Sequence, residues 1–109
     1  MTIAYKILGQ SNPTATSNVD LYTVPANTSV VASTLNICNQ STSTANFRIA
    51  VRPGNAALSA KHYIAYDSAI PALDTISLTI GMSLAATDVV TVYASSSNLS
   101  FNLFGSEIT

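Results

Sequence analysis

The stretch Phe47-Arg-Ile-Ala-Val-Arg52 decides the fold class, because every second residue in it is a large apolar side chain. Successive side chains of a β-strand point to opposite faces, so this alternation predicts a strand with one buried face. Arg48 and Arg52 then share the other face of that strand. Strands of this kind are typical of antiparallel sheets that have one face on the core and one in solvent.

The same alternation recurs along the chain and predicts about eight strands. Their expected ranges are 3–8, 19–24, 31–37, 47–52, 63–66, 76–80, 90–93 and 99–103. Ser, Asn, Pro and Gly gather between them at the spacing typical of sandwiches and jelly rolls. Residues 83–86 are expected to add one helical turn. We therefore expect residues 1–109 to form a single antiparallel β-sandwich of jelly-roll or immunoglobulin-like type.

Charged residues are scarce in this chain. Lys, Arg, Asp and Glu together make up 8% of it, against about 25% in a typical soluble domain. Yet 48% of the residues are hydrophobic, and most remaining polar positions hold Ser, Thr or Asn. Lys and Glu are depleted where proteins meet, because a charge costs more to desolvate than a hydroxyl. The composition therefore predicts a surface that other subunits cover.

Several partner classes are not expected from the composition. Four Lys or Arg and a net charge of −1 do not suit a nucleic-acid surface. No apolar run approaches the ~20 residues of a membrane span, and the start of the chain resembles a strand more than a signal peptide. Cys38 is the single cysteine, so we expect a small buried apolar residue and a chain made in a reducing cytoplasm.

No residue pattern nominates a catalytic centre or a cofactor site. His62 is the single histidine, and Asp67 with one of the many serines would be its partners in a nucleophilic site. We expect instead a histidine at a strand end, bonded to backbone or placed at an interface. One His and one Cys cannot hold zinc, the acidic residues are scattered, and four glycines make no phosphate loop. The chain is expected to be non-enzymatic and free of cofactors and metals.

Two groups of side chains have both a functional and a plain interpretation. Arg48 and Arg52 form a small cationic patch that either keeps an exposed face soluble or grips an Asp or Glu107 of a neighbouring subunit. These three residues are therefore the candidate subunit interface. The five tyrosines either offer a stacking surface for carbohydrate or are ordinary strand residues at the rim of the core.

Six runs spread over the chain add a family resemblance. They are Tyr5-Lys-Ile-Leu-Gly-Gln10, Leu21-Tyr-Thr-Val-Pro25, Phe47-Arg-Ile-Ala-Val-Arg-Pro53, Lys61-His-Tyr-Ile-Ala-Tyr-Asp67, Asp88-Val-Val-Thr-Val-Tyr93 and Phe101-Asn-Leu-Phe-Gly-Ser-Glu107. In these strand-and-turn patterns the chain resembles small virion structural proteins of tailed bacteriophages, particularly those that infect cyanobacteria. The resemblance implies an all-β module of the virion, made in the host cytoplasm, commonly trimeric, without catalytic residues.

Two placements on the virus particle are compatible with that resemblance. A head decoration (cement) protein binds the major capsid protein and ties the lattice together. A tail, neck or baseplate component connects parts or binds carbohydrate on the host surface. The short chain has no coiled-coil heptads or fibre repeats, which favours the decoration protein.

Overall fold

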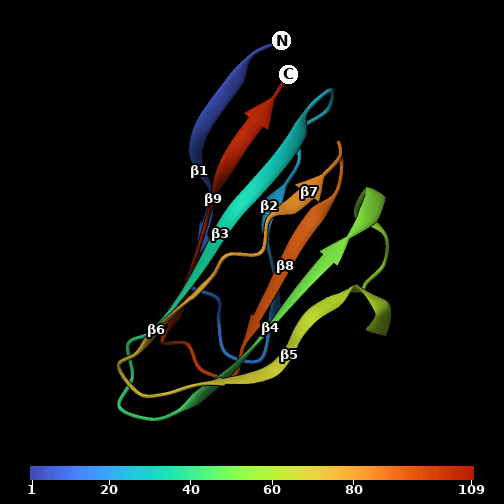
Figure 1. Cartoon of the computed structure of the whole chain (residues 1–109). Helices are drawn as coiled ribbons and strands as arrows, with labels where there is room; N and C mark the ends of the chain where they lie inside the picture. Colours follow the sequence, from blue (N-terminus) through green and yellow to red (C-terminus); the bar gives the residue numbers. More distant parts are fainter.

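Nine β-strands form two antiparallel sheets that pack as a sandwich in the computed structural model, which describes all 109 residues (Figure 1). The strands are β1 (Ile3–Ser11), β2 (Asn18–Thr23), β3 (Ser29–Asn39), β4 (Ala45–Arg52), β5 (Tyr63–Ile70), β6 (Thr75–Leu78), β7 (Met82–Leu84), β8 (Val89–Ala94) and β9 (Leu99–Ile108). Two short 3₁₀ helices, η1 (Pro53–Asn55) and η2 (Ala60–His62), lie between β4 and β5. None of the chain's helical segments has the length and apolar character to cross a membrane. The predicted all-β sandwich is confirmed.

The strands pair in a nested order around the middle of the chain. β4 pairs with β5, β3 with β6 and β7, β2 with β8, and β1 with β9. One sheet, which we call the first sheet, has the order β1-β9-β3-β6, with β7 also on β3, and the second sheet has the order β2-β8-β4-β5. Nested pairing of this kind is a long hairpin wrapped into two sheets, which is the arrangement of a jelly roll.

The core lies between the two sheets and is built from their inward-facing residues. It contains 19 buried side chains from both sheets. Strand β9 contributes Leu99, Phe101 and Leu103, all fully buried, because it lies between β1 and β3 in the first sheet. The alternation that predicted a strand at residues 99–103 is therefore confirmed as the inner face of a central strand.

The segment before β8 differs from the sequence prediction. The strand predicted at 76–80 ends at Leu78, and the helical turn expected at 83–86 is absent. In its place Met82–Leu84 forms β7, which pairs with β3 beyond β6. Gly81 has φ +65° in the left-handed region, so it breaks one edge strand into two pieces that both pair with β3.

A β-bulge changes which side of β3 faces the core. The alternation over residues 31–37 predicts that Val31 shares the buried face of Leu35 and Ile37, but Val31 is 43% exposed. The register with β9 shifts between Ala32 and Thr34, so one extra residue reverses the alternation at that point. On the same strand Cys38 is only partly buried, contrary to expectation, because it alternates with the inward Ile37.

Candidate interaction surfaces

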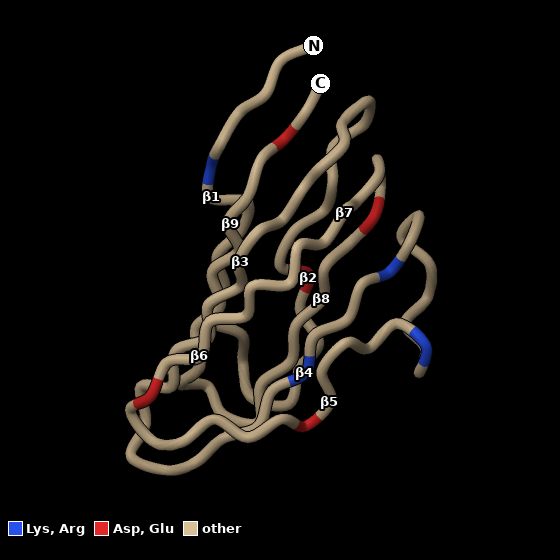
Figure 2. The backbone as a smooth tube through the Cα atoms, in the orientation of Figure 1, with Lys and Arg blue, Asp and Glu red and all other residues tan.

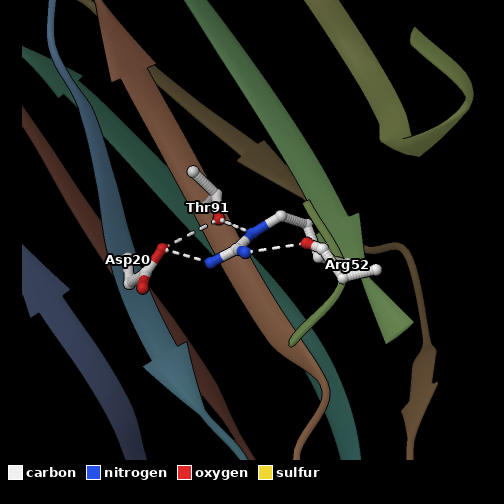
Figure 3. A network of polar contacts seen from close by, with 4 residues as sticks. Asp20, Arg52 and Thr91 are labelled. Atoms are coloured by element: carbon white, nitrogen blue, oxygen red, sulfur yellow. Dashed lines mark hydrogen bonds and ion pairs between the residues drawn. The ribbon is translucent and has the colours of Figure 1, made fainter. Parts of the chain in front are cut away.

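Arg52 joins three strands on the outer face of the second sheet (Figure 3). Its Nη2 lies 2.8 Å from Oδ1 of Asp20 on β2, and its Nε donates to Oγ1 of Thr91 on β8 at 3.0 Å. Thr91 in turn donates to the same Asp20 oxygen at 3.1 Å. The guanidinium also donates to the carbonyl oxygen of Ala56 at 2.8 Å, which anchors the loop after β4.

That loop, residues 53–62, covers part of the outer face of the second sheet. Its 3₁₀ helix η1 contacts β8 and η2 contacts β4. The backbone N–H of Gly54 donates to Oδ1 of Asp88 at 2.8 Å. Ala50 and Val89 are buried although they alternate with inward residues, and they lie on β4 and β8, the two strands that η2 and η1 contact. The first sheet therefore covers the inner face of the second sheet, and this loop covers part of its outer face.

Arg48 shares the outer face of β4 with Arg52, four residues further along, and its guanidinium is held between two aromatic rings. Its central carbon is 4.2 Å from the ring centre of Tyr66 and 4.1 Å from that of Tyr93. Its Nε lies 2.7 Å from Oδ1 of Asp67. The hydrogen bond to Asp67 raises the pKa of Arg48 above its ordinary value, so the group stays charged. This arrangement fixes a cation in place by an ion pair and two cation–π contacts.

Glu107 lies in the first sheet, away from the two arginines. Its Oε1 accepts from Nζ of Lys6 at 3.0 Å, and Oε2 accepts from the hydroxyl of Tyr22. The hydrogen bonds from Tyr22 and Lys6 lower the pKa of Glu107. Each predicted interface residue thus has an oppositely charged partner in its own chain, and their contact with a neighbouring subunit stays a prediction.

The charged residues are few and spread over both sheets (Figure 2). Six of the nine form the ion pairs Lys6–Glu107, Arg48–Asp67 and Arg52–Asp20. Asp74 and Asp88 accept hydrogen bonds from backbone N–H groups. Lys61 alone has no ion pair or hydrogen bond. The chain therefore uses nearly all of its charges to hold its own strands and loops.

His62 is buried at the end of η2, directly before β5. Its Nδ1 accepts a hydrogen bond from the backbone N–H of Ser59 at 3.1 Å, which is the backbone contact expected from the sequence. Its Nε2 is buried without a partner. Asp67, the carboxylate that a catalytic interpretation needed, is bound to Arg48 instead.

The five tyrosines do not form one surface. Tyr22 is buried between the sheets, and burial raises its pKa above the ordinary value, as does its bond to Glu107. Tyr5 is 85% exposed on the first sheet. Tyr63, Tyr66 and Tyr93 lie together on the second sheet, where Tyr63 and Tyr66 meet edge to face at 4.9 Å. Arg48 already occupies one ring face each of Tyr66 and Tyr93.

Two apolar surfaces were not anticipated from the sequence. One is the outer face of β1 with its neighbours, where Ile3, Tyr5, Ile7 and Val31 are exposed; we call it the β1 face. The other is a groove of about 430 Å³ where the edges of β5 and β6 leave the sandwich open. It is lined by Phe47, Ile64, Ala65, Ser68, Ala69, Ile76, Leu78 and Ile80. The alternation Ile3-Ala-Tyr-Lys-Ile7 could have signalled the first surface, but it does not say which face the core covers.

Comparisons of this chain with models of protein families, with curated proteins and with solved structures found no match in any of the three.

Proposed function

We propose that this chain is a non-enzymatic structural subunit of a bacteriophage particle. In this proposal it is a capsid decoration (cement) protein that binds the major capsid protein and stabilises the head lattice. It is made in the host cytoplasm, assembles with copies of itself as a homotrimer, and needs no cofactor, nucleic acid or membrane. The resemblance of its sequence runs to small virion proteins suggests this setting.

The use of its charges is the observation that carries a structural function. Eight of the nine charged side chains bind within the chain, six in ion pairs and two to backbone N–H groups. The surface left for partners consists mainly of hydroxyl, amide and apolar side chains. Such groups cost less to desolvate than free Lys or Glu side chains, so this surface suits contact with other subunits.

A decoration protein does not need high affinity at each contact. A subunit that engages several neighbours on a repeating lattice gains avidity, because each later contact forms at a high effective concentration. Small neutral surfaces of the kind described here are sufficient in that setting. Nothing in this mechanism requires the chain to change shape or to carry out chemistry.

The copy number of the chain per purified virus particle tests the proposal. We expect quantitative mass spectrometry, with the major capsid protein as internal reference, to find hundreds of copies in each particle. A few copies to a few dozen would place the chain in the neck, tail or baseplate. Complete absence from purified particles would overturn the virion function.

The alternative is a tail, neck or baseplate component that binds host-surface carbohydrate. The observation that favours it is a shallow hollow of about 660 Å³ lined by Leu58, Ser59, Ala60, Tyr63 and Tyr66. Saturable glycan binding that disappears in a Tyr66→Ala variant would support this alternative. The Leu73→Ala variant is the control, because Leu73 is exposed in a loop and does not line this hollow.

A further inference from the structure

We propose that two copies of this chain associate through the open edge of β1, pairing antiparallel about a twofold axis beside Tyr5. The proposed function includes association of the chain with copies of itself, and this inference rests on it in that it names a surface for such a contact. The contact extends the first sheet of one copy into the first sheet of the other.

Strand β1 forms an open edge of the first sheet. It is nine residues long, and β9 is its one partner strand (Figure 1). Proteins usually protect such edges with proline, charged side chains (Lys above all), a bulge or a short strand. Along Ile3–Ile7 the edge carries no proline, and its one charge, Lys6, is bound to Glu107 of the same chain. The register shift with β9 lies beyond Ile7. This part of the edge is therefore open to another strand.

The hydrogen-bonding groups of that edge can be assigned residue by residue. Thr2 and Thr109 exchange both of their backbone bonds, at 2.8 and 2.9 Å. In an antiparallel pair such residues alternate with residues that direct N–H and C=O away from the partner. Ala4 and Lys6 therefore bond to β9, whereas Ile3, Tyr5 and Ile7 direct their backbone groups to the open edge.

A second copy of the same edge satisfies these groups. With Tyr5 opposite Tyr5 of the second copy, Ile3 of each copy lies opposite Ile7 of the other. All three pairs consist of residues with free N–H and C=O groups, so each pair exchanges two bonds. Ile3, Tyr5 and Ile7 are 45%, 85% and 51% exposed. They point to the same face, so apolar side chains also meet across the new pairing.

Charge selects this register among its neighbours. If the twofold axis lay at Lys6 and not at Tyr5, Lys6 of one copy would lie opposite Lys6 of the other. Like charges directly opposite destabilise a strand pair. If the axis lay at Ala4, Ile7 would lie opposite Met1, which precedes β1, and would have no strand partner. With Tyr5 on the axis, Lys6 lies opposite Ala4, and its 3.0 Å ion pair with Glu107 of its own chain is retained.

The size of the contact sets its strength. A single strand edge with the β1 face beside it buries no more than about 1,200 Å² in total, which is the lower end for specific interfaces. We therefore expect reversible association with a dissociation constant on the order of micromolar. The species that form through this contact have even copy numbers: a dimer or, if the proposed trimer also forms through another surface, a hexamer.

Sedimentation velocity of the full chain over a range of concentrations, with Tyr5→Pro as the main variant, tests the inference. The N–H of Tyr5 points to the open edge, so proline there removes no bond to β9, and edge strands tolerate proline. We expect Tyr5→Pro to raise the dissociation constant of the twofold contact at least about tenfold, since each copy loses a backbone donor at the axis. The Tyr5→Ala variant keeps that donor and should weaken association less.

A charge variant with its own control completes the design. Tyr5→Asp places two carboxylates opposite each other across the axis and should abolish the even-numbered species. Leu73→Asp, at a loop residue that is 71% exposed, makes the same kind of change away from β1 and should leave them intact. Circular dichroism checks that every variant remains folded.

Three outcomes would overturn the inference: a monomer at all concentrations, a trimer without even-numbered species, or a dimer that Tyr5→Pro does not weaken. Failure of the proposed function is separate, because it is measured as copies per virus particle. A chain that dimerises through β1 but is missing from particles would retain this inference and lose the virion function.

Discussion

The hydroxyl of Tyr22 on β2 donates a hydrogen bond to Oε2 of Glu107 on β9, and this bond joins the two sheets of the sandwich. The other oxygen of Glu107 accepts from Nζ of Lys6 on β1 at 3.0 Å. Tyr22 is 9% exposed and the side chain of Glu107 is 15% exposed, so solvent competes weakly for these bonds. One carboxylate therefore ties the first and last strands to the opposite sheet.

Replacing Tyr22 by Phe should destabilise the protein through loss of this single bond. A hydrogen bond to a charged acceptor contributes about 1.5–3 kcal/mol, so we expect the free energy of unfolding to fall by about that amount near neutral pH. Urea unfolding measures it. Tyr63→Phe is the matched control, because the hydroxyl of Tyr63 makes no hydrogen bond within the chain; equal losses in both variants would contradict the prediction.

The same pair predicts how stability depends on pH. The pKa of Glu107 is lower in the native state than its ordinary 4.5. At a pH between the native pKa of Glu107 and 4.5, this carboxyl group is protonated in the unfolded chain and ionised in the native one. The contribution of Glu107 to the free energy of unfolding is therefore complete above pH 4.5 and is lost as the pH falls through the native pKa. For Tyr22 the native pKa lies above the ordinary 10.0, so its contribution is complete below 10.0 and is lost at higher pH. Because acid protonates Glu107, the free energies of unfolding of wild type and Tyr22→Phe should converge at low pH.

Gly105 should tolerate no side chain. A Cβ at this position would overlap the carbonyl oxygen of Val31 and lie 2.8 Å from Cα of Ala32. Both are backbone atoms of β3, so they cannot turn aside as a flexible side chain does. We expect Gly105→Ala to lower the free energy of unfolding by at least about 2 kcal/mol, measured by thermal or urea unfolding. Ser106→Ala, at the next residue, should change it by less than about 0.5 kcal/mol.

Alternation alone predicted the strands well, and it failed where a partner strand decides the geometry. Residues 47–52 and 99–103 keep a strict period of two, and both form strands with the expected buried face. Val31 breaks the rule because the bulge before Thr34 is set by the pairing of β3 with β9, next to Gly105. No local pattern in β3 contains that information.

The candidate interface shows the same limit. The period of two correctly placed Arg48 and Arg52 on one face. Their carboxylate partners could not be predicted, since the strand order that brings Asp20 next to Arg52 joins residues 32 positions apart. Lys6 and Glu107 are separated by 101 positions and meet only because β1 pairs with β9.

Arg52 should be hard to replace even by another cation. A lysine ammonium cannot reach Asp20, Thr91 and the carbonyl of Ala56 together, as the planar guanidinium does. We expect Arg52→Lys to lower the free energy of unfolding by about 1–3 kcal/mol and to loosen the loop at residues 53–62. Limited proteolysis with an enzyme that does not cleave after Lys or Arg should then cut that loop faster than in wild type.

Lys61→Ala is the control for the arginine variant, because Lys61 lies in the same loop and makes no ion pair. It should leave both stability and the rate of cleavage close to wild type. Unchanged cleavage in Arg52→Lys would mean that the guanidinium does not hold the loop in place.

Asn39, at the end of β3, is a buried side chain whose amide group is fully used. Its exposure is 1%. Its Nδ2 donates toward the carbonyl oxygens of Ser43, Ile70 and Pro71 at 2.9 to 3.1 Å. Its Oδ1 accepts from the backbone N–H and the hydroxyl of Ser41 at 3.0 and 2.8 Å. This one side chain therefore satisfies the backbone of the turn after β3 and of the end of β5.

Replacing Asn39 by Asp should be among the most damaging single changes. The carboxylate keeps the shape but faces three carbonyl oxygens without a donor, so we expect a loss of at least about 3 kcal/mol in the free energy of unfolding at neutral pH. In acid the protonated carboxyl regains one donor, and the deficit should shrink. The matched control is Asn36→Asp on the same strand, whose Oδ1 accepts from the hydroxyl of Ser77 and keeps that ability. A comparable loss in both variants would show that the added charge, and not the missing donor, causes the damage.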